Sequence, residues 1–393
     1  MNGRNSRLRP GVMAVVWESL VRIATRPIYW VGIFVLPLFT FLLITSLMES
    51  GLPQKVPAGI IDHDGSALSR QITQSLGSMQ LVDLVENPTS YSDARHSMQE
   101  GKIFGFFMIP ENFEADLLSG KAPEITFYTN MTYYVPGSLL FKTFKATAVY
   151  AKAGVAVRVM DDVGVADAPR SLLQPLNIQA RAIGNPWLNY GVYLANSFVP
   201  AVLQLMIMLM TCYCLGEEIK YHTSPRLLRL AGGSVYKAIL GKLLPQTVIW
   251  VVIAIFMEAW LFGINGYPVY GSWFWITLSE IMFVLACQGW AVFIFGVLPN
   301  LRLSLSACAL LGILAFSIAA FSFPYESMYP AIGIFSWILP VRYNLLIYID
   351  QALNGIDIYY SRIWFVAYIV FMLLPFTFLW RIKREMAKPV YVP

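Results

Sequence analysis

The sequence predicts an α-helical polytopic membrane protein with six transmembrane helices and an inserted extracytoplasmic α/β domain. Three observations predict this fold class. Hydrophobic residues make up 57% of the chain and charged residues only 13%, whereas an average soluble protein has about 25% charged residues. Apolar runs of about 20 residues, the length that crosses a bilayer as a helix, recur along the chain. A polar stretch with alternating strand and helix patterns separates the first run from the others.

Residues 1–27 start with Arg4, Arg7 and Arg9, and apolar residues then follow at helical spacing. This pattern predicts a cytoplasmic N-terminus with an amphipathic interfacial helix; a simple polar leader is the alternative. Residues 28–48 carry no charge and predict the first transmembrane helix, about 30 Å long. A signal peptide is disfavoured because this run starts late and lacks a small-residue cleavage site.

The polar residues 49–189 predict the extracytoplasmic α/β domain, in which strands and helices alternate as in a small open sheet. A loop with several prolines closes it at 161–185. Asp62 and Asp64 suggest metal ligands, but an Asp-x-Asp-Gly sequence after a strand more often forms a turn. The predicted strands are 56–62, 80–85, 102–109 and 124–128, and the predicted helices are 66–76, 90–99, 111–118 and 136–160.

Five further apolar runs predict the remaining transmembrane helices, at 190–215, 243–262, 273–298, 303–323 and 363–380. Residues 324–362 are apolar but broken by prolines, and predict a re-entrant or interfacial segment on the outer side. The last residues, 381–393, form a basic cytoplasmic tail.

Basic residues gather next to alternate ends of the apolar runs, where the positive-inside rule places the cytoplasm. Both termini are therefore expected in the cytoplasm, and the polar domain outside a bacterial cytoplasmic (inner) membrane. The net charge of +5 follows from this bias, so nucleic acid is not an expected partner, whereas the lipid bilayer is.

The segment 216–242 between two apolar runs is densely charged and predicts a cytoplasmic loop or short amphipathic helix that meets a partner. The alternative is contact with lipid headgroups, which its basic residues would serve in any case. The candidate coupling residues are Glu217, Glu218, Lys220, Thr223, Arg226, Arg229, Lys237 and Lys242.

Glu258 and Glu280 lie inside apolar runs, and a carboxylate within a membrane is costly enough to suggest a function. A hydrated position near the outer end of each span is the alternative. Pro324, Met328 and Pro340 in the broken outer segment complete the candidates for a substrate path.

No catalytic or metal site is predicted. The spacing of a nucleotide-binding P-loop is absent, because Tyr236 stands where its first glycine would precede Gly241-Lys242, and Leu243 follows. All four cysteines fall inside apolar runs and indicate buried small side chains. Paired mid-membrane carboxylates, a histidine cluster and a serine elbow are all missing, which argues against an intramembrane enzyme.

The order of these parts resembles the permease subunit of ABC-2-type exporters, in the branch with a large extracytoplasmic domain after the first span. Four stretches carry the resemblance: VPAGIIDHDGSALSRQI, GKIFGFFMIPENFEADLLSGKAPEITFY, the segment from Glu217-Glu218 through Thr223 to Gly241-Lys242, and FSFPYESMYP with SWILPVRYNLLIYIDQALNG. The resemblance covers essentially the whole chain. His222 stands where the family has glycine, and Gly232-Gly233 near its usual proline.

The resemblance implies a dimeric permease, homo- or heterodimeric, that moves an amphipathic or hydrophobic substrate such as a drug or lipid. ATP and Mg²⁺ would bind to two cytoplasmic ABC ATPase subunits, and this chain would bind no cofactor. The N-terminal helix and the loop 217–238 would dock these subunits, and a periplasmic adaptor is a further candidate partner. The alternative is a membrane-anchored receptor or binding protein that acts through its extracytoplasmic domain.

Overall fold

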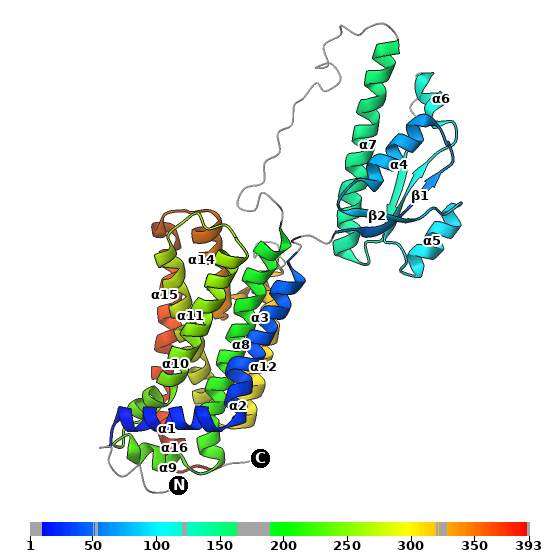
Figure 1. The fold of residues 1–393 in the computed structure, drawn as a ribbon. Helices are drawn as coiled ribbons and strands as arrows, with labels where there is room; N and C mark the ends of the chain where they lie inside the picture. The colour runs from blue at the N-terminus through cyan, green and yellow to red at the C-terminus, as the bar shows by residue number, and fades with distance from the viewer. Residues whose placement is uncertain are drawn as a thin grey trace. The chain divides into compact units, whose positions relative to one another are not determined.

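The computed structural model describes residues 10–49, 51, 54–119, 124–162, 189–319, 321 and 328–390. Two compact units share the chain. The larger combines Met1–Gly51 with Ala182–Pro393, and the smaller comprises Leu52–Arg181 (Figure 1). Each unit has its own buried apolar core.

The larger unit is helical, and among its described residues six helices are long and apolar enough to cross a membrane. The protein is therefore a mostly helical, polytopic membrane protein. The six are Pro27–Leu47, formed by α2 (Pro27–Trp30), η2 (Val31–Val35) and α3 (Leu36–Leu47); α8 (Tyr190–Lys220); Val235–Ile264, formed by α10 (Val235–Ala259) and η4 (Trp260–Ile264); α11 (Trp273–Val297); α12 (Leu301–Ile318); and Ile358–Ala387, formed by α15 (Ile358–Leu373), η7 (Leu374–Phe378) and α16 (Leu379–Ala387).

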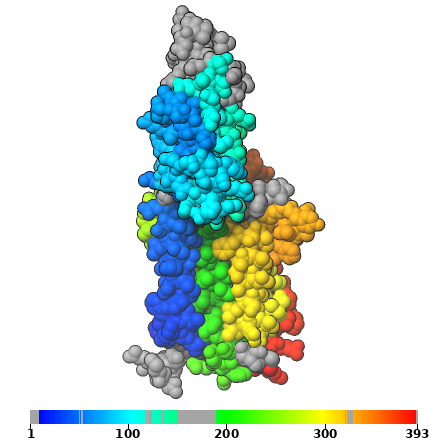
Figure 2. Space-filling model, turned by 90° about the vertical axis from the view of Figure 1, so that its right-hand side faces the viewer, coloured from blue at the N-terminus to red at the C-terminus, as the bar shows by residue number. Residues whose placement is uncertain are grey.

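Helix α8 is the central element of this unit. It packs against α3, α11 and α12, and Figure 2 shows the face on which α8 lies between α3 and α12. Close packing depends on Gly312 of α12, where an added Cβ would lie 2.4 Å from Leu205 Cδ1. Small residues at such crossings are typical of helices in membranes.

Two shorter elements occupy the stretch predicted as an outer re-entrant segment. Helix α13 (Pro330–Ser336) and the helix Pro340–Leu353, formed by α14 (Pro340–Tyr348) and η6 (Ile349–Leu353), meet at an angle of 84°. Proline starts both helices, where its missing N–H needs no partner. The segment ends earlier than the predicted 324–362, because α15 already begins at Ile358.

The charged segment 216–242 is more helical than the sequence indicates. Helix α8 continues to Lys220 and α10 begins at Val235, so only the short helix α9 (Ser224–Leu230) and its flanking turns lie between them. The apolar runs 190–215 and 243–262 are therefore shorter than the helical segments that contain them, α8 and α10 with η4. Where these helices leave a bilayer stays a prediction, because a helix end does not mark a membrane surface.

Helix α1 (Val12–Thr25) lies across the end of the bundle and packs against α10 and α9 (Figure 1). It buries Val15 and Ile23, while Met13 and Trp17 are exposed. Its crossing with α10 is close: a Cβ added to Gly241 would lie 2.8 Å from Val15 Cβ and 2.9 Å from the Val12 carbonyl oxygen.

The smaller unit is built on a four-stranded sheet in the order β2-β1-β3-β4. Strand β1 pairs in parallel with β2 and β3, and β3 pairs antiparallel with β4. The elements are β1 (Val56–Asp62), α4 (Ala67–Gly77), β2 (Val82–Glu86), α5 (Tyr91–Gln99), β3 (Gly105–Ile109), α6 (Phe113–Leu118), β4 (Thr126–Thr129) and α7 (Tyr134–Asp162). The predicted strand 102–109 is shorter, since it begins at Gly105.

Asp62 serves as a turn residue at the end of β1. Its Oδ1 accepts the backbone N–H groups of Asp64 and Gly65, each at 3.0 Å, and its Oδ2 accepts the Ser69 hydroxyl at 2.7 Å. The neighbouring Ser66 accepts the Ser69 N–H and caps α4. The local geometry therefore matches the turn interpretation of this Asp-x-Asp-Gly sequence.

The chain leaves and re-enters the larger unit at one point. Gly51 follows α3, and its carbonyl oxygen accepts the N–H of Tyr190, the first residue of α8, at 2.7 Å. Asn189 caps α8 by accepting the N–H of Gly191 at 2.7 Å. The smaller unit is thus inserted at a joint, defined by Gly51 and Tyr190, where the departing and the returning chain segments are hydrogen-bonded to each other.

Candidate functional site

Two acidic side chains are completely buried in the last turn of α8. Glu217 and Glu218 have no exposed surface, and Lys242 of α10 is 2% exposed. The Lys242 ammonium donates a short hydrogen bond to Glu218 Oε1, and it lies 3.5 Å from Glu217 Oε1. Charges this deep are stable only when they are paired.

Two arginines near the first span complete the pairing. Arg22 of α1 lies 2.5 Å from Glu218 Oε1 and 3.3 Å from Glu217 Oε1. Arg26, which follows α1, lies 2.5 Å from Glu217 Oε2. The residues Glu217, Glu218, Lys242, Arg22 and Arg26 are called the ion cluster below; they join α1, α8 and α10.

Hydrogen bonds and a further carboxylate surround the ion cluster. The Tyr29 hydroxyl donates to Glu217 Oε1 at 2.8 Å, and Glu18 Oε1 accepts from Arg22 Nη2 at 2.8 Å. Burial disfavours the charged form of Arg22, but the neighbouring carboxylates outweigh it, so the pKa of Arg22 lies above its ordinary value.

The surface helix α9 is connected to the ion cluster at its start. The Thr223 hydroxyl donates a short hydrogen bond to Glu218 Oε2. The Arg226 guanidinium is 63% exposed and lies 3.7 Å from Glu18 Oε2. A displacement of α9 would therefore act on buried charges that hold three other helices.

The structure divides the predicted coupling residues into two groups. Glu217, Glu218 and Lys242 belong to the ion cluster, Thr223 contacts it, and Arg226 lies beside Glu18, the carboxylate next to the cluster. Lys220, Arg229 and Lys237 are exposed; the Lys220 ammonium lies over the Tyr221 ring, 5.6 Å from its centroid.

Sequence reasoning missed the partners from α1 and from the start of the first span, namely Glu18, Arg22, Arg26 and Tyr29. One signal was present: Glu18 and Arg22 are four residues apart and so share a face of one helix, and Arg26 continues this spacing just past the end of α1. Glu18 pairs locally with Arg22, but Arg26 has no acidic residue three or four positions away, so its partner had to come from elsewhere in the chain.

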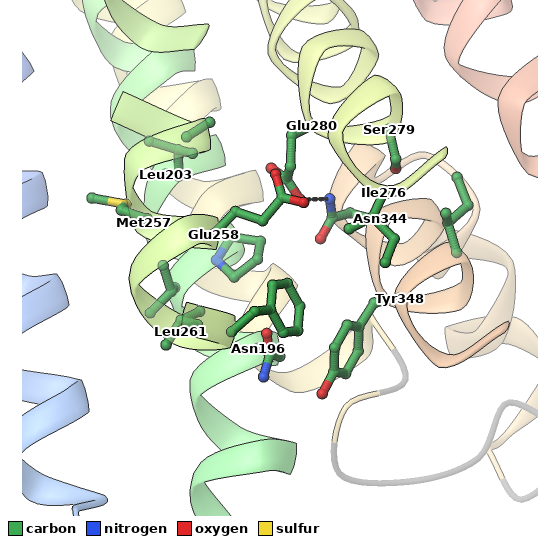
Figure 3. A pocket seen from close by; sticks show the side chains of 15 residues that line it. Asn196, Leu203, Met257, Glu258, Leu261, Ile276, Ser279, Glu280, Asn344 and Tyr348 are labelled. Atoms are coloured by element: carbon green, nitrogen blue, oxygen red, sulfur yellow. Dashed lines mark hydrogen bonds between the residues drawn. The ribbon is translucent and has the colours of Figure 1, made fainter. Parts of the chain in front are cut away.

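A cavity lies between α8, α10, α11 and α14 in the part of the bundle away from the ion cluster. Glu258 follows Lys242 by 16 residues on α10, which corresponds to about 24 Å along a helix. Figure 3 shows the carboxylates of Glu258 and Glu280 turned toward one another in this cavity. The structure thus brings together two of the predicted substrate-path residues.

The remaining substrate-path candidates lie elsewhere. Pro340 is buried at the start of α14, and the following N–H, of Val341, donates to Gln204 Oε1 of α8 at 2.8 Å. Met328 precedes α13 and does not line the cavity. Pro324 lies outside the described residues.

Comparisons with known proteins match the chain to a family of transporters. The family model described as ABC-2 family transporter protein matches residues 27–380, most of the chain. The linearmycin resistance permease protein LnrN of Bacillus subtilis (strain 168) is 29% identical over 116 residues, which are 30% of this chain and 30% of the relative. The chain therefore spans about three tenths of the length of the curated relative that it matches.

Proposed function

Because the chain belongs to the ABC-2 family of transporter proteins, we propose that it is the transmembrane permease subunit of an ATP-driven exporter. Its substrate would be an amphipathic or hydrophobic compound moved out across a bacterial cytoplasmic membrane. Family membership implies ATPase subunits as partners, and these would hold ATP and Mg²⁺. A second permease subunit, identical or different, would complete the transporter, and a periplasmic adaptor is an additional proposed partner.

The ion cluster is the observation that carries this proposal. A transport subunit without its own ATPase must receive motion from a partner through its surface. Helix α9 offers exposed Arg226 and Arg229 on that surface, and Thr223 connects it to the fully buried Glu218. ATP-driven closure of the partner would move α9 and α1 together as a rigid body and shift α8 and α10 with them.

The charge pattern supports a cytoplasmic position for this end of the bundle. Helix α9 is basic, and α16 carries Arg381, Lys383 and Arg384 at the end of the last span. Basic residues beside membrane spans favour the cytoplasm. With α1 and α16 on that side, the smaller unit, inserted after a single span, would lie outside.

The similar protein from Bacillus subtilis is named as a resistance permease. This name supports a substrate that the cell removes, which for this chain is part of the proposal.

Co-purification with the partner tests the proposal. The chain would be co-expressed with its candidate ATPase, and the double variant Arg226→Glu/Arg229→Glu compared with the wild type. Both side chains are exposed, so the fold should survive, whereas the reversed charges should release the ATPase. Arg362→Glu is the matched control, because Arg362 is exposed at the start of α15, where its guanidinium lies over the Tyr359 ring.

Loss of the ATPase from the double variant alone is the expected result. A double variant that retains the ATPase as the wild type does would remove α9 as the docking surface. A wild-type chain that purifies without any ATPase under all conditions would favour the receptor alternative.

A further inference from the structure

We propose that the cavity containing Glu258 and Glu280 binds the ammonium group of a cationic amphiphile, and that such amphiphiles are the substrate class of this permease. This inference rests on the proposed export function. It starts from one side chain, Glu258, which is 6% exposed and lines the cavity. Neither of its carboxylate oxygens has a hydrogen-bond partner among the described residues.

An unpaired carboxylate inside an apolar bundle is costly, and structural carboxylates at this depth are normally paired. The ion cluster of the same bundle shows the usual solution, since Glu217 and Glu218 are each matched by cations. None of the fifteen described residues that line the cavity is basic. Because no described lining residue supplies a positive charge, we expect a cationic ligand to supply it.

The second carboxylate strengthens the preference for a cation. Glu280 Oε1 accepts the side-chain N–H of Asn344 at 2.7 Å, and this bond leaves its other oxygen available. Asn196 donates to the Val192 carbonyl at 3.0 Å, so its own oxygen remains an acceptor at the same cavity (Figure 3). These acceptors suit the three N–H donors of a primary ammonium group.

The walls of the cavity favour an organic cation over a metal ion. Leu203, Leu261 and Ile276 supply apolar surface, and Phe262 and Tyr348 stack with centroids 6.1 Å apart. Such surfaces bind a carbon stem and attract a cation to an aromatic face. No group of three or more His, Cys, Asp or Glu side chains that could hold a metal ion occurs among the described residues. The cavity volume is about 40 Å³, which is room for an ammonium group and the carbon atoms next to it, so the remainder of an amphiphile would extend beyond the cavity.

Direct binding to the purified permease tests this inference. The probe is monodansylcadaverine, a primary amine on a five-carbon stem with a fluorescent aromatic group, and its N-acetyl derivative is the neutral counterpart. Fluorescence anisotropy would follow both probes with the full chain in lipid nanodiscs. We expect the amine to bind saturably and the acetylated probe about tenfold more weakly, as for the loss of a charge-assisted hydrogen bond.

Variants assign the binding to this cavity. Glu258→Gln should weaken amine binding by about tenfold. Asp350→Asn should leave it unchanged, because Asp350 is a carboxylate of the same bundle that accepts from Ser361 and Trp364 and does not line the cavity. The inference would be overturned if Glu258→Gln bound the amine probe as tightly as the wild type does. It would also be overturned if the wild type bound the amine and the acetylated probe equally. The probe comparison needs no variant, so misfolding of Glu258→Gln would not remove the test.

Two further outcomes are informative. Displacement of the amine by dilute CaCl₂ or NaCl, at matched ionic strength, would overturn the inference in favour of an inorganic cation site. Since the binding assay contains no ATPase, its result is independent of the co-purification test. A chain that co-purifies with the ATPase but binds no amine refutes the substrate class alone, whereas a chain that binds the amine but never co-purifies with an ATPase refutes the exporter.

Discussion

At the scale of single residues, the ion cluster distributes its charges unevenly. Glu217 is held by Arg26 and the Tyr29 hydroxyl, both outside α10. Glu218 depends on Lys242 and Arg22. Lys242 is thus the cation through which α10 is tied to α8. Its hydrocarbon stem also fills space, since the whole side chain is 2% exposed.

Lys242→Met keeps most of that volume but removes the charge. It leaves Glu218 with one cation, and breaking a buried pair typically costs about 3–5 kcal/mol. We expect a lower thermal unfolding temperature in detergent, and no stimulation by substrate of the ATPase activity of the proposed complex. Lys237→Met, an exposed position on the same helix, is the control.

The double variant Lys242→Met/Glu218→Gln removes both charges and should recover part of the lost stability. If Lys242→Met and Lys237→Met unfold at the same temperature, the buried pair does not stabilise the bundle.

At the scale of elements, α1 and α10 form one mechanical unit because their backbones approach closely at Gly241. The side chain of Val15 and the carbonyl of Val12 occupy the space that a larger residue would need. This approach brings Arg22, two turns farther along α1, to the ion cluster. The absence of a side chain at Gly241 therefore allows Arg22 of α1 to reach the buried carboxylates of α8.

Gly241→Ala is expected to push α1 away from α10, because its Cβ would lie 2.8 Å from Val15 Cβ. Overpacking of this kind costs about 1–3 kcal/mol. The variant should lower the unfolding temperature and reduce transport-coupled ATPase activity of the complex. Gly263→Ala is the matched control in the same helical span, since its Cβ would meet nothing within 4 Å. Equal activities of the two variants would contradict the role of this crossing.

The elements also show what local sequence can predict. Apolar runs and capped turns depend on neighbouring residues, so the six long helices and the strand–turn–helix at Asp62 follow from the sequence. The ends of α8 and α10 do not, because Glu217 and Lys242 look like loop residues until each has a partner. Helix formation there depends on a contact across 25 residues of chain.

The candidate site was predictable to a similar degree. Glu217, Glu218 and Lys242 stood out as charges beside apolar runs, and Glu258 and Glu280 as charges within them. Their contacts with Arg22 and Asn344 involve separations of up to about two hundred residues, which no periodicity reveals. Asn344 itself lies in a stretch whose helical structure the prolines obscured.

At the scale of the whole molecule, the chain consists of a bundle and an inserted sheet unit with separate cores. The bundle holds both the ion cluster and the cavity. Its continuity does not depend on the insertion, because the carbonyl of Gly51 and the N–H of Tyr190 are already 2.7 Å apart. The entropy cost of closing a loop grows only slowly with the length of the loop, so a long insertion between two such points costs little more than a short one.

Replacing residues 54–187 by a short Gly-Ser linker should therefore leave the bundle folded. We expect the shortened protein to insert into membranes, elute as one species and retain the ATPase during purification. Its unfolding temperature should stay close to that of the full chain. Aggregation of the shortened protein with several linker lengths would show that the bundle requires the inserted unit.

The joint at Gly51 and Tyr190 also has an evolutionary consequence. Recombination at this point can enlarge, exchange or delete the inserted unit without disturbing a single helix crossing of the bundle. Descendants of one ancestor can thereby differ in the inserted unit while they inherit the same ion cluster and the same helix crossings.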